Sequence, residues 1–291
     1  MNEKFQGIFP ALLTPYTSDD HINTEALRRL IRFNLDKGVK GFYVCGSTAE
    51  AFLLTMEERK QILETVVDEA SGKATIIAHI GCISTSQAIE LALHAESQGV
   101  DAISSIPPFY FNFSFEEIKN YYFDIIDRVN APLIIYNFPD FSGVTLNADN
   151  INVFLNDKRI LGIKHTSSDF YSLERFKRIR QDTVVFSGFD QMFLSGLAAG
   201  ADGAIGSTYN FMAEKFVLID QLYKAGKMPE ALQVQIKANN IMQAVMKIGV
   251  MPAEKAILDI LGLDFGTCRK PFRVPTREEY QILEQVLAEN S

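Results

Sequence analysis

The sequence has few cysteines and no long apolar run, and both absences narrow the class of protein. Cys45, Cys82 and Cys268 are the only cysteines and form no C-x-x-C pair, which argues against a disulfide scaffold and suits a reducing compartment. No stretch of about 18 residues is apolar throughout, and the N-terminus shows no basic segment followed by an apolar one. The sequence therefore predicts a cytoplasmic protein without a membrane partner.

Positive charge is also in deficit, and the usual cofactor motifs are missing. The chain carries 28 basic and 36 acidic residues, for a net charge of -8, so its overall field repels phosphate backbones and predicts no nucleic-acid partner. The four histidines have neither H-x-x-x-H nor H-x-H spacing, and neither a Walker loop nor G-x-G-x-x-G occurs. We expect no metal site and no nucleotide cofactor.

What the chain does have is a regular alternation of short apolar runs with longer amphipathic segments. Most of the runs are continuously apolar, which is typical of parallel strands covered on both faces. Eight strands are predicted, at Ile8–Tyr16, Gly41–Gly46, Ala74–Gly81, Ala102–Pro107, Pro132–Pro139, Leu161–Thr166, Thr183–Phe189 and Gly203–Thr208.

A helix is predicted after each strand. These helices are Thr24–Lys37, Thr55–Ala70, Ser84–Gln98, Ser114–Val129, Leu146–Leu155, Ser168–Arg180, Asp190–Ala199 and Phe211–Ala225. Eight such modules favour an α/β fold of the (β/α)₈ TIM-barrel type over the alternative, a doubly wound open sheet. Only helices follow, at Pro229–Met246, Pro252–Leu261 and Arg277–Glu289. We therefore expect a barrel domain at 1–225 and a helical extension at 226–291, packed on the barrel without a flexible linker.

Barrel enzymes carry their reacting groups at the C-terminal ends of the strands, and three positions there are informative. Lys164 lies in a buried strand, where desolvation lowers a lysine pKa and leaves an amine able to attack a ketone. Gly46-Ser47-Thr48 offers backbone N–H groups and hydroxyls to a carboxylate, and the phenol of Tyr136 can relay a proton. The alternatives are a salt-bridged strand lysine, an ordinary turn and a core tyrosine.

These residues resemble a known family, the pyruvate-dependent class I aldolases that include N-acetylneuraminate lyases and 4-hydroxy-tetrahydrodipicolinate synthases. The resemblance covers essentially the whole chain and implies that Lys164 forms a Schiff base with pyruvate, Ser47 and Thr48 hold its carboxylate, and Tyr136 shuttles the proton. It is carried by five motifs, Gly46-Ser47-Thr48-Ala49-Glu50, Pro108-Phe109-Tyr110, Tyr136-Asn137-Phe138-Pro139, Gly162-Ile163-Lys164-His165-Thr166 and the run from Gly200 to Thr208.

Within this family the chain is more similar to the lyase branch. The synthases place an arginine where this chain has Phe141. By resemblance to the lyases, Tyr110 would come from a neighbouring subunit of a homotetramer to complete the proton relay. The residues expected to contact the polyhydroxy part of a sugar acid are Thr166, Gly188, Asp190, Gln191 and Ser207.

Two departures from the family pattern bear on the site. Ala49 stands where a glycine is usual, which affects the loop only if that glycine needs a positive φ. Gln191 replaces a glutamate of the lyases, so it keeps an acceptor oxygen and loses a charge.

The resemblance implies a cofactor-free enzyme that cleaves N-acetylneuraminate reversibly to N-acetylmannosamine and pyruvate. The nearest alternatives are an aldolase for another 2-keto-3-deoxy sugar acid and an enzyme like the dihydrodipicolinate synthases. From a different class, the chain could be a pyruvate-responsive binding protein without catalysis, since a fold does not guarantee a reaction.

Overall fold

Eight parallel strands organise the computed structural model, which describes residues 3–291; Met1 and Asn2, the first residues of the predicted barrel domain, lie outside the described part. The strands form one sheet whose order follows the chain, β1-β8-β7-β6-β5-β4-β3-β2. Their bounds are β1 Gly7–Pro10, β2 Gly41–Val44, β3 Thr75–His79, β4 Ala102–Ser105, β5 Leu133–Asn137, β6 Ile160–His165, β7 Val184–Ser187 and β8 Gly203–Gly206.

The first strand segment makes hydrogen bonds on both of its sides. The N–H of Gly7 donates to the carbonyl of Asp202 at 3.1 Å, beside β8, and the N–H of Leu12 donates to the carbonyl of Tyr43 in β2 at 3.0 Å. An open doubly wound sheet instead reverses its strand order at a switch point. The chain therefore has the (β/α)₈ barrel fold that the sequence predicts, with helices at its C-terminal end.

The chain forms two compact units, and the first comprises residues 3–7 and 75–205. It contains β3 to β7, and every residue of β3, β4 and β5 is buried, as expected of parallel strands covered on both faces. Its helices are α3 Thr85–Ser97, α4 Phe115–Ile126, α5 Pro139–Ser142, α6 Asn152–Leu155, α7 Phe170–Ile179 and α8 Phe193–Ala198.

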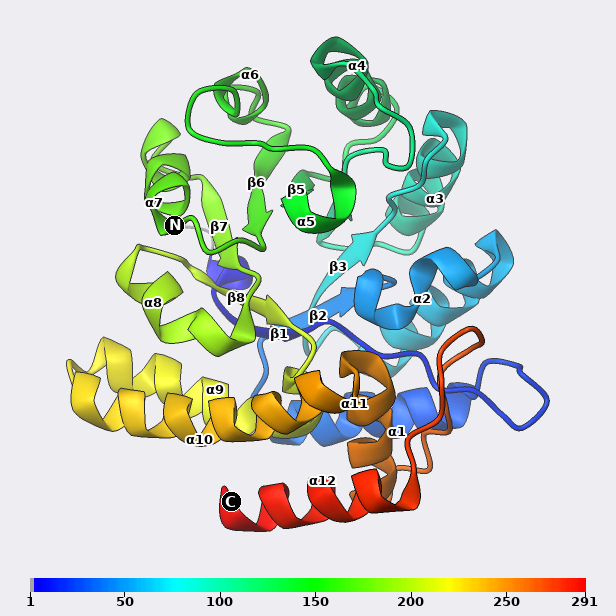
Figure 1. The fold of residues 1–291 in the computed structure, drawn as a ribbon. Coiled ribbons are helices and arrows are strands. Elements are labelled where there is room, and N and C mark those ends of the chain that lie inside the picture. The colour runs from blue at the N-terminus through cyan, green and yellow to red at the C-terminus, as the bar shows by residue number, and fades with distance from the viewer. Residues whose placement is uncertain (1–2) are drawn as a thin grey trace. The chain divides into compact units, whose positions relative to one another are not determined.

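The second unit comprises Ile8–Ala74 and Gly206–Ser291. It contains α1 Thr24–Asp36, α2 Met56–Ala70, α9 Tyr209–Lys224, α10 Met228–Ile248, α11 Val250–Ile260 and α12 Arg277–Glu289. Helices α9 and α10 run side by side, and α10 also packs against α11 and α12 (Figure 1). The predicted boundary between barrel and extension, at residues 225 and 226, falls in the connection between α9 and α10.

The helix starts predicted at Thr55 and Ser114 are confirmed, and each of these residues caps its helix. The Thr55 side chain accepts from the N–H of Glu58, whose carboxylate accepts in return from the N–H of Thr55, and Ser114 and Glu117 make the same capping box. Each box satisfies two N–H groups that the first helical turn leaves without partners.

Several predicted boundaries are wrong, among them the following three. The predicted helix Leu146–Leu155 shrinks to α6, because Asn147 and Asn150 side chains bond to nearby backbone groups and form a turn instead. The predicted strand to Pro139 ends at Asn137, and Pro139 begins α5, where its missing N–H costs nothing. The first strand ends at Pro10 rather than Tyr16.

Candidate active site

Lys164 and Tyr136 are neighbours across two strands of the first unit. They are register partners on β6 and β5, and partners in adjacent parallel strands project from the same face of the sheet. The Nζ of Lys164 lies 4.0 Å from the centroid of the Tyr136 ring. The two residues are 5% and 3% exposed. A primary amine and a phenol are thus held together in a buried place.

Burial changes the acid–base behaviour of Lys164. It lowers the pKa of the ammonium from 10.5 to about 7, and the carboxylate of Asp190, which favours the charged form, opposes this only in part. A lysine with this pKa carries a neutral amine in about half of the molecules at pH 7. The physical cause is the one that the sequence predicts, removal of the ammonium from water.

Thr166 and Gly188 lie against each other at the ends of β6 and β7. A Cβ at position 188 would come within 1.9 Å of the Thr166 Oγ1, so only glycine fits there. The Thr166 hydroxyl is buried and has no hydrogen-bond partner among the residues that the structure describes. Burying a hydroxyl without a partner is costly, and it leaves this group ready to bind a ligand. Asp190 is the first residue of the 3-10 helix Asp190–Met192, which belongs to the same unit, and its side chain is buried.

The close approach of Gly188 to Thr166 leads to a testable prediction about the stability of the protein. We expect Gly188→Ala to lower the free energy of unfolding by about 1–3 kcal/mol, because the methyl group overpacks the site. Adding Thr166→Ala removes the 1.9 Å contact but leaves the Thr166 Cβ at 2.8 Å, so it should restore only part of the loss. Urea denaturation of the two variants measures this, and an unchanged midpoint for Gly188→Ala would contradict the packing described here.

Side chains around Tyr136 and Lys164 include several that the sequence did not single out. The His79 ring meets Tyr136 edge-on at 6.0 Å, and the Phe138 ring stacks on Tyr136 at 5.9 Å. His165, next to Lys164 in the chain, accepts a hydrogen bond from Asn137 at 3.0 Å on Nδ1 and donates from Nε2 to the carbonyl of Asp169 at 3.0 Å. No local pattern signals these contacts, because they depend on the register of neighbouring strands.

Phe141 and Tyr110 are both exposed aromatic residues of the first unit. Phe141 lies on α5, with its ring 4.3 Å from that of Phe138. Tyr110 follows β4, is 84% exposed, and has a φ of 76°, a strained value for a residue other than glycine. Tyr110 packs edge-on against Phe111, at 5.0 Å. Tyr110 is thus exposed to solvent, whereas Lys164 and Tyr136 are buried.

Ser47, Thr48 and Ser207 belong to the second unit. Ser47 and Thr48 lie in a 3-10 turn, Ser47–Ala49, and both are half-buried. The positive φ in this turn falls on Glu50, at 59°, and not on Ala49. The departure from glycine at position 49 therefore does not strain the loop. Ser207 follows β8, and its hydroxyl donates to Glu254 at 2.6 Å.

Residues 3–291 include no group of three or more His, Cys, Asp or Glu side chains that could hold a metal ion. In the same range, no helix combines the length and the apolar character needed to cross a membrane. All three cysteines are buried thiols that take no part in a disulfide.

The fold and the site together define a class: a (β/α)₈ barrel protein that holds a buried amine of low pKa beside a tyrosine at the strand ends. The chain belongs to the dihydrodipicolinate synthetase family, whose model matches residues 4–290.

Proteins similar to the chain carry more specific names. An N-acetylneuraminate lyase of Rhizobium meliloti (strain 1021) is 44% identical over 286 residues, which cover 98% of this chain and 95% of the relative. A sialic acid aldolase of Ruminococcus gnavus, a catalytic lysine mutant, superposes with a TM-score of 0.96 at 35% identity, over 100% of this chain and 97% of the other. CdNal of Clostridium difficile, solved with mannosamine, has a TM-score of 0.95 at 38% identity, over 98% and 99% of the two chains.

Proposed function

We propose that this chain is a class I aldolase that cleaves N-acetylneuraminate reversibly to N-acetylmannosamine and pyruvate. The observation that carries the proposal is the buried Lys164 amine, with its pKa near 7, beside Tyr136. The names of the relatives support the same substrate, and a catalytic lysine is named for one of the similar aldolases.

The reaction follows from these two side chains. The neutral Lys164 amine attacks the C2 ketone of the open-chain sugar acid, water leaves, and an iminium forms. The electron pair of the C3–C4 bond moves into the iminium to give an enamine, while Tyr136 relays the proton of the C4 hydroxyl and N-acetylmannosamine is released as an aldehyde. The proton is delivered to C3 of the enamine, and water then releases pyruvate from Lys164. The iminium is the electron sink, so the proposed mechanism uses no cofactor.

The same proposal assigns the binding residues. Ser47 and Thr48 hold the carboxylate of the substrate through hydroxyl and backbone N–H groups. Thr166, Gly188, Asp190, Gln191 and Ser207 contact its polyhydroxy part. The buried Thr166 hydroxyl, which has no hydrogen-bond partner within residues 3–291, supports this assignment. Gln191 in place of a glutamate changes how sugar hydroxyls are held, because an amide accepts without a negative charge.

We further propose that the active form is a cytoplasmic homotetramer in which Tyr110 reaches a neighbouring subunit to complete the relay. The exposure of Tyr110 and Phe111, which pack on each other, supports this, since a cluster of exposed aromatic side chains is typical of an interface. The three buried thiols, none of them in a disulfide, fit a reducing compartment.

A second candidate function has the same mechanism and a different sugar acid as substrate, and so releases a different aldehyde. This candidate is an aldolase for another 2-keto-3-deoxy sugar acid, and the observation that favours it is Gln191 in place of a glutamate. A synthase-like reaction is disfavoured by Phe141, which offers no charge to the carboxylate of a second substrate.

The direct test is incubation of the purified protein with N-acetylneuraminate, followed by detection of pyruvate through coupled lactate dehydrogenase. The proposal expects pyruvate release. Release from other sugar acids alone would favour the second candidate. Pyruvate binding without any cleavage or borohydride trapping would favour a binding protein.

The pKa of Lys164 predicts the pH dependence of the reaction. A lowered amine pKa means that the free enzyme is mostly protonated, and cannot attack, below pH 7, and mostly neutral above it. We expect kcat/KM to fall about tenfold for each pH unit below an apparent pKa of about 7. A pH–rate profile measures this, and a limb centred near the ordinary lysine value of 10.5 would contradict the buried amine.

A further inference from the structure

Helix α11, Val250–Ile260, buries two adjacent charged residues. Glu254 is 0% exposed and Lys255 is 1% exposed, and such side chains are almost never fully buried unless they are paired. Consecutive helix residues point about 100° apart, so the two can reach different neighbours. Lys255 contacts Glu50, and Glu254 contacts Ser207.

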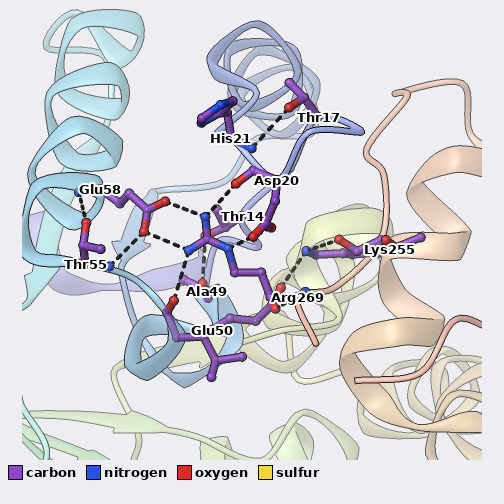
Figure 2. Close-up of polar contacts among 12 residues, drawn as sticks. Thr14, Thr17, Asp20, His21, Ala49, Glu50, Thr55, Glu58, Lys255 and Arg269 are labelled. Carbon is purple, nitrogen blue, oxygen red and sulfur yellow. Dashed lines mark hydrogen bonds and ion pairs between the residues drawn. The ribbon is translucent and has the colours of Figure 1, made fainter. Parts of the chain in front are cut away.

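Lys255 anchors the residue that ends the Ser47–Ala49 turn. Its Nζ donates to Glu50 Oε1 at 2.6 Å and to the carbonyl of Thr267 at 3.1 Å. The second oxygen of Glu50 accepts from the N–H of Arg269 at 2.8 Å. Lys255 also lies 4.2 Å from the centroid of the Tyr16 ring. Figure 2 shows Lys255 beside this carboxylate.

The segment that carries Arg269 is itself held by charge. The Arg269 guanidinium bonds to Glu58 through Nη1 at 2.8 Å and to Asp20 through Nε at 3.0 Å (Figure 2). It is the main reason why the pKa of the Glu58 carboxyl is lowered. Both oxygens of Glu50 therefore bond to groups that are fixed elsewhere in the unit.

The backbone of Glu50 explains why an anchor is needed. Its φ of 59° and ψ of 33° are left-handed, a conformation that costs a residue other than glycine free energy and persists only when its surroundings hold it. In this conformation its N–H donates to the carbonyl of Ser47 at 3.0 Å, and the carbonyl of Ala49 accepts from the Thr14 hydroxyl at 2.8 Å. The turn that presents Ser47 and Thr48 is thus closed by Glu50.

Glu254 fixes the direction of the Ser207 hydroxyl. Ser207 donates its only hydroxyl proton to Glu254 Oε1, at 2.6 Å, in a charge-assisted bond. A serine whose proton is used in this way can only accept from a ligand. Ser207 is then selective for a substrate group that donates, a hydroxyl or an N–H, and rejects a carbonyl or a carboxylate.

We propose that α11 is a positioning element for both ends of the substrate: Lys255 acts through Glu50 on the turn that binds the carboxylate, and Glu254 acts through Ser207 on the polyhydroxy part. Neither residue is proposed to touch the substrate. The inference rests on the proposed function, because it takes Ser47, Thr48 and Ser207 as binding residues.

The test measures the two KM values of the condensation reaction separately. We expect Lys255→Met to raise the KM for pyruvate about 10–100-fold, the scale of one lost hydrogen bond to a charged group, with the KM for N-acetylmannosamine changed less than about twofold. Glu254→Gln should do the opposite, raising the KM for N-acetylmannosamine and leaving that for pyruvate. The exposed Lys247→Met on α10 is the matched control and should change neither.

Two further measurements keep the test decisive. Lys255→Met leaves a buried carboxylate unpaired, so the double variant Glu50→Gln/Lys255→Met, which removes both charges, guards against misfolding. It should fold and still show the raised KM for pyruvate. If the wild-type protein does not use N-acetylmannosamine, the half-saturating pyruvate concentration in borohydride trapping still reports the effect of Lys255→Met. Failure of the proposed substrate and failure of the positioning role are therefore distinguishable. Equal changes in both KM values, or a change in melting temperature alone, would overturn the inference.

Discussion

Lys164→Met should abolish turnover while leaving the protein folded. Methionine has nearly the length of lysine and no amine, so no Schiff base can form, and we expect kcat/KM to fall by on the order of 10⁴ or more. Pyruvate release from N-acetylneuraminate, measured by coupled lactate dehydrogenase, tests this directly.

Thermal stability provides the control for Lys164→Met. The folded pKa of about 7 lies below the unfolded value of 10.5, so the unfolded state binds more protons between these values and stability rises with pH across this window. Below pH 7 the full penalty for burying the ammonium applies, and methionine removes it. We therefore expect a higher melting temperature for Lys164→Met at pH 7. The exposed Lys158→Met, shortly before β6, should leave turnover unchanged. More than trace activity in Lys164→Met would show that another group is the nucleophile.

Tyr136→Phe has the second largest expected effect. It keeps the aromatic ring 4.0 Å from the Lys164 amine and removes only the phenol oxygen. If Tyr136 relays the proton of the C4 hydroxyl, kcat should fall about 10²–10⁴-fold, the usual contribution of general acid–base catalysis. Steady-state kinetics with N-acetylneuraminate measure the fall.

Trapping separates this role of Tyr136 from a structural one. Tyr136→Phe should still form an adduct with pyruvate under borohydride, because Lys164 is intact. Tyr122→Phe is a matched control, since Tyr122, on α4, donates its hydroxyl proton to the carbonyl of Ser105 and has no proposed part in the reaction. Loss of trapping in Tyr136→Phe in proportion to kcat would mean that the tyrosine only positions the lysine.

The strand and helix order could be predicted from the sequence because it depends on local patterns. Apolar runs, capping boxes at Thr55 and Ser114, and glycines such as Gly38 and Gly99, which end helices with positive φ, are readable without any long-range contact. Several strands were predicted to extend too far, because apolar residues continue past the end of the observed strand. Ile106, for example, is buried although β4 ends at Ser105.

For the candidate site, the sequence singles out residues but not the contacts between them. A lysine within a buried strand stands out in one sequence, and so does a serine–threonine pair after a strand. The pairing of Lys164 with Tyr136 depends on how the separate strands β5 and β6 are aligned in the sheet, which the residues of either strand alone do not show. Glu254 and Lys255 were missed because their partners, Ser207 and Glu50, are distant in the chain. Two adjacent charges in the otherwise apolar start of α11 were nevertheless a visible signal.

The central claim is that Lys164 is the nucleophile, and the most direct test is chemical trapping. The protein is incubated with pyruvate and reduced with borohydride, digested with a protease, and its peptides are analysed by mass spectrometry. The account predicts one reduced pyruvyl group, located on Lys164 and absent without pyruvate. Trapping on another lysine, such as the buried Lys255, or no adduct from a protein that turns over its substrate, would contradict it.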